Sequence, residues 1–255
     1  MWKQIKYHLY ILLNRKSTKW GFFIFFSIPL IFYIFFLLGI SKITSANGSA
    51  FPFFVGFLVL LYFIWRSFLI PVFLVISTNW HKEFINGLHE ISFVYFNDRK
   101  KFIIGLIISQ MIIFCLYFIS FTIGFIIYWL LLNKLYSFEI IYPSFNDFLE
   151  ALPILLIYLS YSFFEIFLTN LFSLKFDTFK SVLYNIFIFV LFSFLGTDKK
   201  ILFIPFSFFN NVEKFYSDNL FSLNHFIVMI IYSIILVFIL IKLLNKKDIN
   251  SDYIE

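Results

Sequence analysis

The feature that most constrains this chain is a series of long apolar runs separated by polar segments. Six runs approach or exceed the ~20 residues that a helix needs to cross the hydrocarbon layer of a membrane. They cover residues 21–40, 53–78, 102–132, 149–172, 181–196 and 225–244. We therefore predict an all-α, polytopic membrane protein with a six-helix transmembrane domain in residues 21–245, whose long third helix is tilted or bent.

The composition agrees with lipid as the main solvent of the chain. Hydrophobic residues make up 62% of the 255 positions and charged residues only 13%, which is too little polar surface for a soluble protein of this size. The 43 Phe residues suit lipid-facing positions and do not by themselves indicate a binding surface. Cys115 is the single cysteine and lies in an apolar run, so we expect no disulfide framework, metal cluster or redox chemistry.

Lysine and arginine are distributed unequally between alternate sides of the predicted spans. Fourteen fall on the side of the two termini and five on the other side. Because positive charge is retained in the cytoplasm, both termini should be cytoplasmic in a multi-pass protein of the cell membrane, with residues 246–255 as a cytoplasmic tail. The net charge of +6 reflects this topology and attraction to anionic membrane lipid, and we expect no nucleic-acid partner.

Residues 1–20 form a basic arm without any acidic residue. Helical spacing gives this arm an apolar face made of Trp2, Ile5, Leu9, Leu12 and Leu13. We predict an amphipathic helix that lies in the membrane interface, with a simple positively charged topogenic arm as the open alternative. The apolar run that follows exceeds the core of a signal peptide, so we expect a retained first span.

The loop between the second and third runs is longer and more patterned than a connector requires. Residues 82–96 have an apolar helical face made of Phe84, Ile85, Leu88, Ile91 and Tyr95. An amphipathic helix here would present a surface to a soluble partner or lie in the membrane interface without one. The basic cluster that follows, and that we expect to anchor the third span at the interface, consists of Arg99, Lys100 and Lys101.

The same loop carries a spaced motif: Glu83 at the end of the second run, Gly87 and Leu88 shortly after it, and Asn97 to Arg99 before the third run. Together with the N-terminal helix and the six-span layout, this motif resembles the permeases of the type-2 ABC exporter class. Among these it resembles Gram-positive exporters of amphipathic or antimicrobial peptides, of the lantibiotic-immunity or phenol-soluble-modulin type. The chain departs from the usual form at Lys82, where Arg is common, and at Asn97-Asp98, where Ser-Pro is common.

The resemblance implies a coupling helix at 82–96 that docks into a groove on an ABC ATPase subunit. The coupling residues would be Lys82, Glu83, Phe84, Gly87, Leu88 and Ile91. It also implies two copies of that ATPase, which bind ATP and Mg²⁺, and a second permease chain, the same or related. The permease itself would bind no cofactor. A hydrophobic or amphipathic peptide suits its Phe-rich pathway better than a sugar or an ion.

Two ionisable residues lie inside apolar runs, Arg66 in the second and Glu165 in the fourth. Charged side chains are costly in lipid, so both are candidates for function. Both spans run from outside to inside, and each residue lies roughly 13 to 16 positions from the outer end of its span, which gives similar depths. The sequence therefore allows an intramembrane ion pair. A structural clamp, a substrate contact and separate water-filled cavities all stay open as roles.

The last external loop contains the apolar stretch 201–209, which is too short to span and too apolar to be exposed. We predict a re-entrant segment at 200–212 before the final helix. An interfacial helix is the open alternative. Members of the resembled family commonly place a lid of this kind at the external exit.

Motifs for ATP binding and for hydrolysis are missing from the sequence. It contains no G-x-x-x-x-G-K-[ST], G-x-S-x-G or H-E-x-x-H, and its histidines, which we predict near interfaces, are His8, His81, His89 and His225. We expect a non-enzymatic chain that uses ATP hydrolysed by a separate subunit. Two alternatives stay open. A secondary transporter or channel would need more intramembrane polar residues, and a membrane immunity or scaffold protein would transport nothing.

Overall fold

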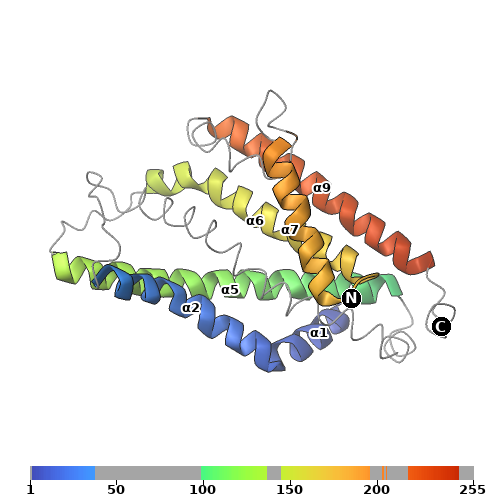
Figure 1. Cartoon of the computed structure of the whole chain (residues 1–255), viewed down its shortest axis with the longest axis horizontal. Coiled ribbons are helices and arrows are strands. Elements are labelled where there is room, and N and C mark those ends of the chain that lie inside the picture. Colours follow the sequence, from blue (N-terminus) through green and yellow to red (C-terminus); the bar gives the residue numbers. More distant parts are fainter. Residues whose placement is uncertain are drawn as a thin grey trace. The chain divides into compact units, whose positions relative to one another are not determined.

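The computed structural model of the chain describes residues 2–37, 99–136, 145–195, 203, 205 and 218–246. The helices in these ranges (Figure 1) are α1 (Trp2–Asn14), α2 (Lys16–Leu37), α5 (Arg99–Tyr136), α6 (Phe145–Ser173), α7 (Thr178–Leu195) and α9 (Asn219–Lys246). No strand occurs in the ranges described, which confirms the all-α class for that part of the chain. The predicted second span, the coupling helix at 82–96, most of 200–212 and the tail after residue 246 lie outside the described residues.

Two of the described helices are long and apolar enough to cross a membrane, over Lys100–Tyr128 of α5 and Leu220–Leu243 of α9. They differ in burial: 56% of the apolar window in α5 is buried within the chain, but only 17% of the window in α9. The exposed side chains of α9 include Ile227, Ile231 and Phe238. Because a long, exposed apolar helix needs an apolar solvent, α9 in particular suggests association with a membrane.

The chain divides into two compact units. Unit 1 comprises Met1–Phe68 and Gly105–Phe148, and therefore holds α1, α2 and most of α5. Unit 2 comprises Leu69–Ile104 and Leu149–Glu255, and holds most of α6 together with α7 and α9.

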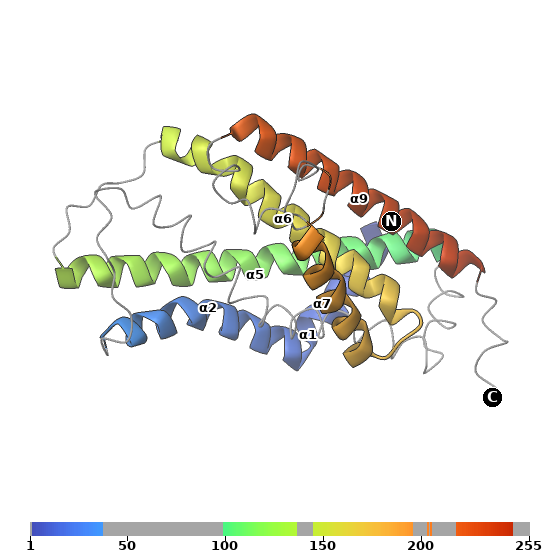
Figure 2. The ribbon, with the colours of Figure 1, turned by 45° about the horizontal axis from the view of Figure 1, so that its top comes forward.

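In unit 1, α2 runs beside α5, and α1 turns away from the line of α2 at Arg15 (Figures 1 and 2). The arm predicted as one helix over 1–20 is thus divided, since α1 ends at Asn14 and α2 begins at Lys16. Side-chain hydroxyls of α5 donate hydrogen bonds to backbone carbonyl oxygens of the two helices. These bonds join Ser109 to Ile5 at 3.2 Å, Tyr117 to Thr18 at 3.1 Å and Ser120 to Phe22 at 3.1 Å.

Glycine allows the helices of unit 1 to approach closely. A Cβ atom at Gly124 of α5 would lie 2.3 Å from the carbonyl oxygen of Phe26 in α2, a distance that side chains cannot occupy. Seven residues before Gly124 in α5, the ring of Tyr117 stacks on Phe25 of α2, with centroids 4.9 Å apart. The contact between α2 and α5 therefore depends on a missing side chain at one position and on a buried aromatic pair at another.

In unit 2, α6 and α7 form a hairpin around the short turn 174–177 (Figure 2). The backbone N–H of Phe176 donates to the carbonyl of Phe172 at 2.9 Å, which closes the end of α6. Asp177 caps α7 by accepting a hydrogen bond from the Lys180 N–H at 2.8 Å, and Asp218 caps α9 by accepting from the Phe221 N–H at 2.9 Å. Such caps explain why both helices begin where they do.

Candidate functional site

A stripe of polar side chains runs along α6 in unit 2. We call it the α6 polar stripe, and it consists of Tyr161, Glu165, Thr169 and Ser173. A spacing of four residues puts these side chains on one face of the helix. Each of them is 5% exposed or less. Buried polar groups on an apolar helix mark either a contact between helices or a functional site.

The stripe contacts α9 through Tyr161. A hydrogen bond of 2.5 Å joins the Tyr161 hydroxyl to Nε2 of His225, and the two rings meet edge to face with centroids 5.5 Å apart. Both side chains are completely buried. His225 of α9 is thus fully buried against α6, and its place near a membrane interface stays a prediction.

The stripe contacts α7 through Asn185. The Asn185 side-chain Nδ2 donates to Thr169 Oγ1 at 2.8 Å and to the backbone carbonyl of Glu165 at 3.4 Å. The Thr169 hydroxyl donates to the same carbonyl at 2.8 Å. Asn185 Oδ1 is buried and has no hydrogen-bond partner among the described residues. It is therefore an acceptor that a donor group entering this region could use.

Glu165 places a carboxyl group inside unit 2, with 5% of the residue exposed. Burying an ionised carboxylate costs several kcal/mol unless other groups compensate for it, in order-of-magnitude terms. The predicted partner Arg66 lies outside the described residues, so the intramembrane ion pair stays a prediction. The role of Glu165 as a candidate functional residue likewise stays a prediction.

Of the other predicted site residues, only the basic anchor is described. Arg99 is the first residue of α5, and Lys100 and Lys101 are exposed in its first turn. The six coupling residues at 82–91 lie outside the described part of the chain. Their role stays a prediction.

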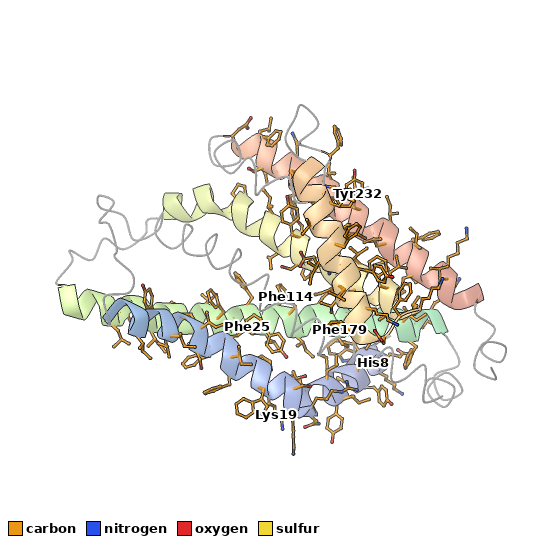
Figure 3. The ribbon with its side chains drawn as sticks, viewed as in Figure 1. His8, Lys19, Phe25, Phe114, Phe179 and Tyr232 are labelled. Atoms are coloured by element: carbon orange, nitrogen blue, oxygen red, sulfur yellow. The ribbon has the colours of Figure 1, made fainter. Side chains whose placement is uncertain are left out.

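The predicted re-entrant segment is described at two residues. The Tyr232 hydroxyl of α9, labelled in Figure 3, donates a hydrogen bond of 2.9 Å to the carbonyl of Phe203. Phe203 is exposed and Pro205 is buried. The backbone at Phe203 is thus fixed to the last helix, whereas the course of 200–212 as a whole stays a prediction.

Reasoning from the sequence missed three residues of this region, Tyr161, Thr169 and Asn185. It also missed that His225 is buried. Spacing along α6 could have revealed the stripe, because its four members recur at a constant interval of four. The contacts to α7 and α9 could not be read in this way, since 64 residues separate Tyr161 from His225.

The chemistry available in unit 2 is that of hydrogen bonding and proton binding. Tyr161, Glu165 and His225 each carry a titratable group, and Asn185 adds an amide. In the ranges the structure describes, no group of three or more His, Cys, Asp or Glu could hold a metal ion. The arrangement can orient polar groups between three helices or receive a donor at Asn185.

Comparison with protein-family models, with curated proteins and with solved structures finds no match for this chain. Its function is therefore argued from its own residues. The features available are the apolar spans, the patterned loop at 82–99 and the α6 polar stripe.

Proposed function

We propose that the chain is the membrane-spanning subunit of an ATP-binding cassette exporter of the type-2 class. It moves a hydrophobic or amphipathic substrate, a peptide, out of the cell with ATP hydrolysed by a separate subunit. The observation that carries the proposal is the loop at 82–101, with its acidic residue, glycine, amphipathic pattern and terminal basic cluster. The start of α5 at Arg99 supports it, because the basic cluster then opens a long apolar helix.

In the proposed mechanism, two permease chains line a pathway and two ATPase subunits bind the loops at 82–96. ATP binding and hydrolysis rock the permeases between inward-open and outward-open states. This chain transmits the movement through Glu83 and the apolar face of the loop. The scarcity of charged residues in the spans agrees with an apolar route driven by an external motor.

A pull-down tests the proposal. The chain is solubilised in mild detergent from its native membrane, and bound ATPase activity is compared between wild type and the double variant Glu83→Lys, Gly87→Asp. We expect an ATPase subunit to co-purify with wild type and to be lost from the double variant. The control is Glu139→Lys, which repeats the Glu-to-Lys change of position 83 in a loop predicted to be external.

Absence of ATPase from the wild-type sample would contradict the proposal, provided that the detergent keeps a peripheral subunit bound in a known exporter treated in parallel. Equal ATPase activity in wild type and the double variant would contradict the coupling role of 82–96 alone. Equal loss in the control and in the double variant would show a general effect of charge.

The α6 polar stripe favours one second candidate, a secondary transporter driven by an ion gradient. That class places polar and titratable groups in the membrane, and unit 2 buries Glu165 and the Tyr161–His225 pair. The two candidates differ in energy source. Transport that needs ATP supports the exporter, and transport that follows an imposed proton gradient without ATP supports the secondary transporter.

A further inference from the structure

Contacts within unit 1 fix which face of α1 is covered. Ser109 Oγ of α5 donates a hydrogen bond of 3.2 Å to the carbonyl of Ile5, and a Cβ at Gly105 would lie 2.9 Å from the Cβ of Gln4. The residues of α1 buried on this side are Gln4, Ile5, His8 and Leu12. The apolar face predicted from the sequence is thus split, because Ile5 and Leu12 are buried while Trp2 and Leu13 are exposed.

The opposite face of α1 is exposed and combines lysines with aromatic rings. We call it the basic–aromatic face, and it consists of Trp2, Lys3, Lys6, Tyr7 and Tyr10. Trp2 is 63% exposed and Tyr10 is 72% exposed. Lys6 Nζ lies 5.5 Å from the centroid of the Trp2 ring, within range of a cation–π contact. Large exposed rings beside cations are typical of side chains that lie at the headgroup level of a membrane.

The charge of this region selects an anionic occupant. Residues 1–20 contain no Asp or Glu, so the lysines have no carboxylate within the arm. Lys16 and Lys19 at the start of α2 are exposed as well, and Lys19 points away from the helices in Figure 3. The aromatic rings then distinguish a lipid surface from a soluble anion, because Trp and Tyr favour the boundary between headgroups and acyl chains.

We propose that the basic–aromatic face of α1 binds anionic phospholipid headgroups. Lys3 and Lys6 pair with lipid phosphates, and Trp2 and Tyr10 insert at the base of the headgroup layer. Lipid contact is thereby assigned to the side of α1 opposite Ile5 and Leu12. The inference does not depend on the proposed exporter function, since it concerns only the arm and its packing on α5.

The experiment uses the full-length chain in nanodiscs of phosphatidylcholine with increasing amounts of phosphatidylglycerol. An environment-sensitive dye on Asn14→Cys, in a Cys115→Ser background, reports from an exposed position four residues after Tyr10, on the same side of α1 as the basic–aromatic face. A lysine near an anionic surface contributes about five-fold in affinity, so Lys3→Gln, Lys6→Gln should weaken the apparent affinity for phosphatidylglycerol about 30-fold. Lys3→Arg, Lys6→Arg should restore it. The control Lys242→Gln, an exposed lysine of α9, should not change it.

Three outcomes would overturn the proposal. The first is an unchanged affinity in the Lys3→Gln, Lys6→Gln variant when its circular dichroism and monodispersity match wild type. The second is an equal response to phosphatidylcholine alone, which would mean that charge is not recognised. The third is displacement by soluble glycerol phosphate, which would identify a free phosphate site instead of a lipid surface.

Discussion

The two units hold their helices together in different ways. In unit 1, hydroxyls of α5 bond to backbone carbonyls of α1 and α2, and Gly124 lets two backbones meet. In unit 2, two of the bonds between helices join side chains, Tyr161 to His225 and Asn185 to Thr169, and Asn185 also donates to the carbonyl of Glu165. A helical carbonyl keeps its own intrahelical partner when the hydroxyl is removed, whereas a buried side chain loses a hydrogen bond that no helical ladder replaces.

This difference indicates where chemistry can reside. Unit 1 also buries polar residues, Gln4 and His8 among them, but the described hydrogen bonds between its helices end on backbone carbonyls, and Gly124 serves close packing. In unit 2, Tyr161, His225 and Asn185 instead bond to side chains of neighbouring helices, and Glu165 is buried on the same stripe. Burial of such groups is costly, which makes them candidates for a role in specificity or function. Removal of a polar group should therefore lower the free energy of unfolding less in unit 1 than in unit 2.

The largest effect is expected for Gly124→Leu in unit 1. A side chain at this position would meet the backbone of Phe26 at 2.3 Å, and backbone cannot move aside without separating α2 from α5. We expect a loss of about 3 kcal/mol in the free energy of unfolding, at the upper end for overpacking. Unfolding in detergent, followed by circular dichroism, measures it. The control is Ile123→Leu, on the exposed side of the same turn, which should leave stability unchanged.

An unchanged midpoint for Gly124→Leu would contradict the close contact of α2 and α5. An equally large loss in the Ile123→Leu control would indicate that this whole turn tolerates no change. The loss in Gly124→Leu could then not be assigned to the contact with Phe26.

The second effect concerns the Tyr161–His225 pair in unit 2. Removing one partner should cost about 1 to 3 kcal/mol, because the buried polar group of the other loses this hydrogen bond. The double variant Tyr161→Phe, His225→Leu should cost less than the sum of the single changes, with a coupling energy of about 0.6 to 1.7 kcal/mol. A double-mutant cycle on the unfolding free energy measures this coupling. Strictly additive losses would mean that the bond contributes nothing to stability.

The smallest effect is expected for Ser109→Ala in unit 1. The carbonyls of Ile5 and Gly105 accept from the Ser109 hydroxyl but also belong to helical ladders, so their loss of one donor should cost less than about 0.5 kcal/mol. The same unfolding assay measures it, with Ser120→Ala as a second example of the same bond type. A loss equal to that of His225→Leu would remove the distinction between the two units.

The sequence predicted the helices better than it predicted their contacts. The apolar runs at 102–132, 149–172, 181–196 and 225–244 all lie largely within described helices. The helices extend beyond the runs where polar residues continue them, as at Arg99 in α5, or begin after caps such as Asp218. Hydropathy cannot detect such ends. An aspartate just before a predicted helix, such as Asp218, is nevertheless an N-cap signal that can be read from the sequence.

Other features could not be predicted from the pattern. The division of the N-terminal arm at Arg15 has no Gly or Pro to signal it. The face of α1 that packs on α5 includes Gln4 and His8, so apolar periodicity alone selected a different set of residues. Glu165 was singled out from the sequence because it is charged in an apolar run, whereas Asn185 and Tyr161 acquire their importance only from contacts between helices.

The most direct test of the proposed function is transport in inverted membrane vesicles that contain the chain and its native partners. Uptake of a fluorescent amphipathic peptide is measured with ATP, with a non-hydrolysable ATP analogue, and with an imposed proton gradient in the absence of nucleotide. Of these three conditions, we predict uptake only with ATP. We expect this uptake to be lost in the double variant Glu83→Lys, Gly87→Asp. Uptake driven by the proton gradient without ATP, and abolished by Glu165→Gln, would contradict the exporter and establish unit 2 as the site of ion coupling.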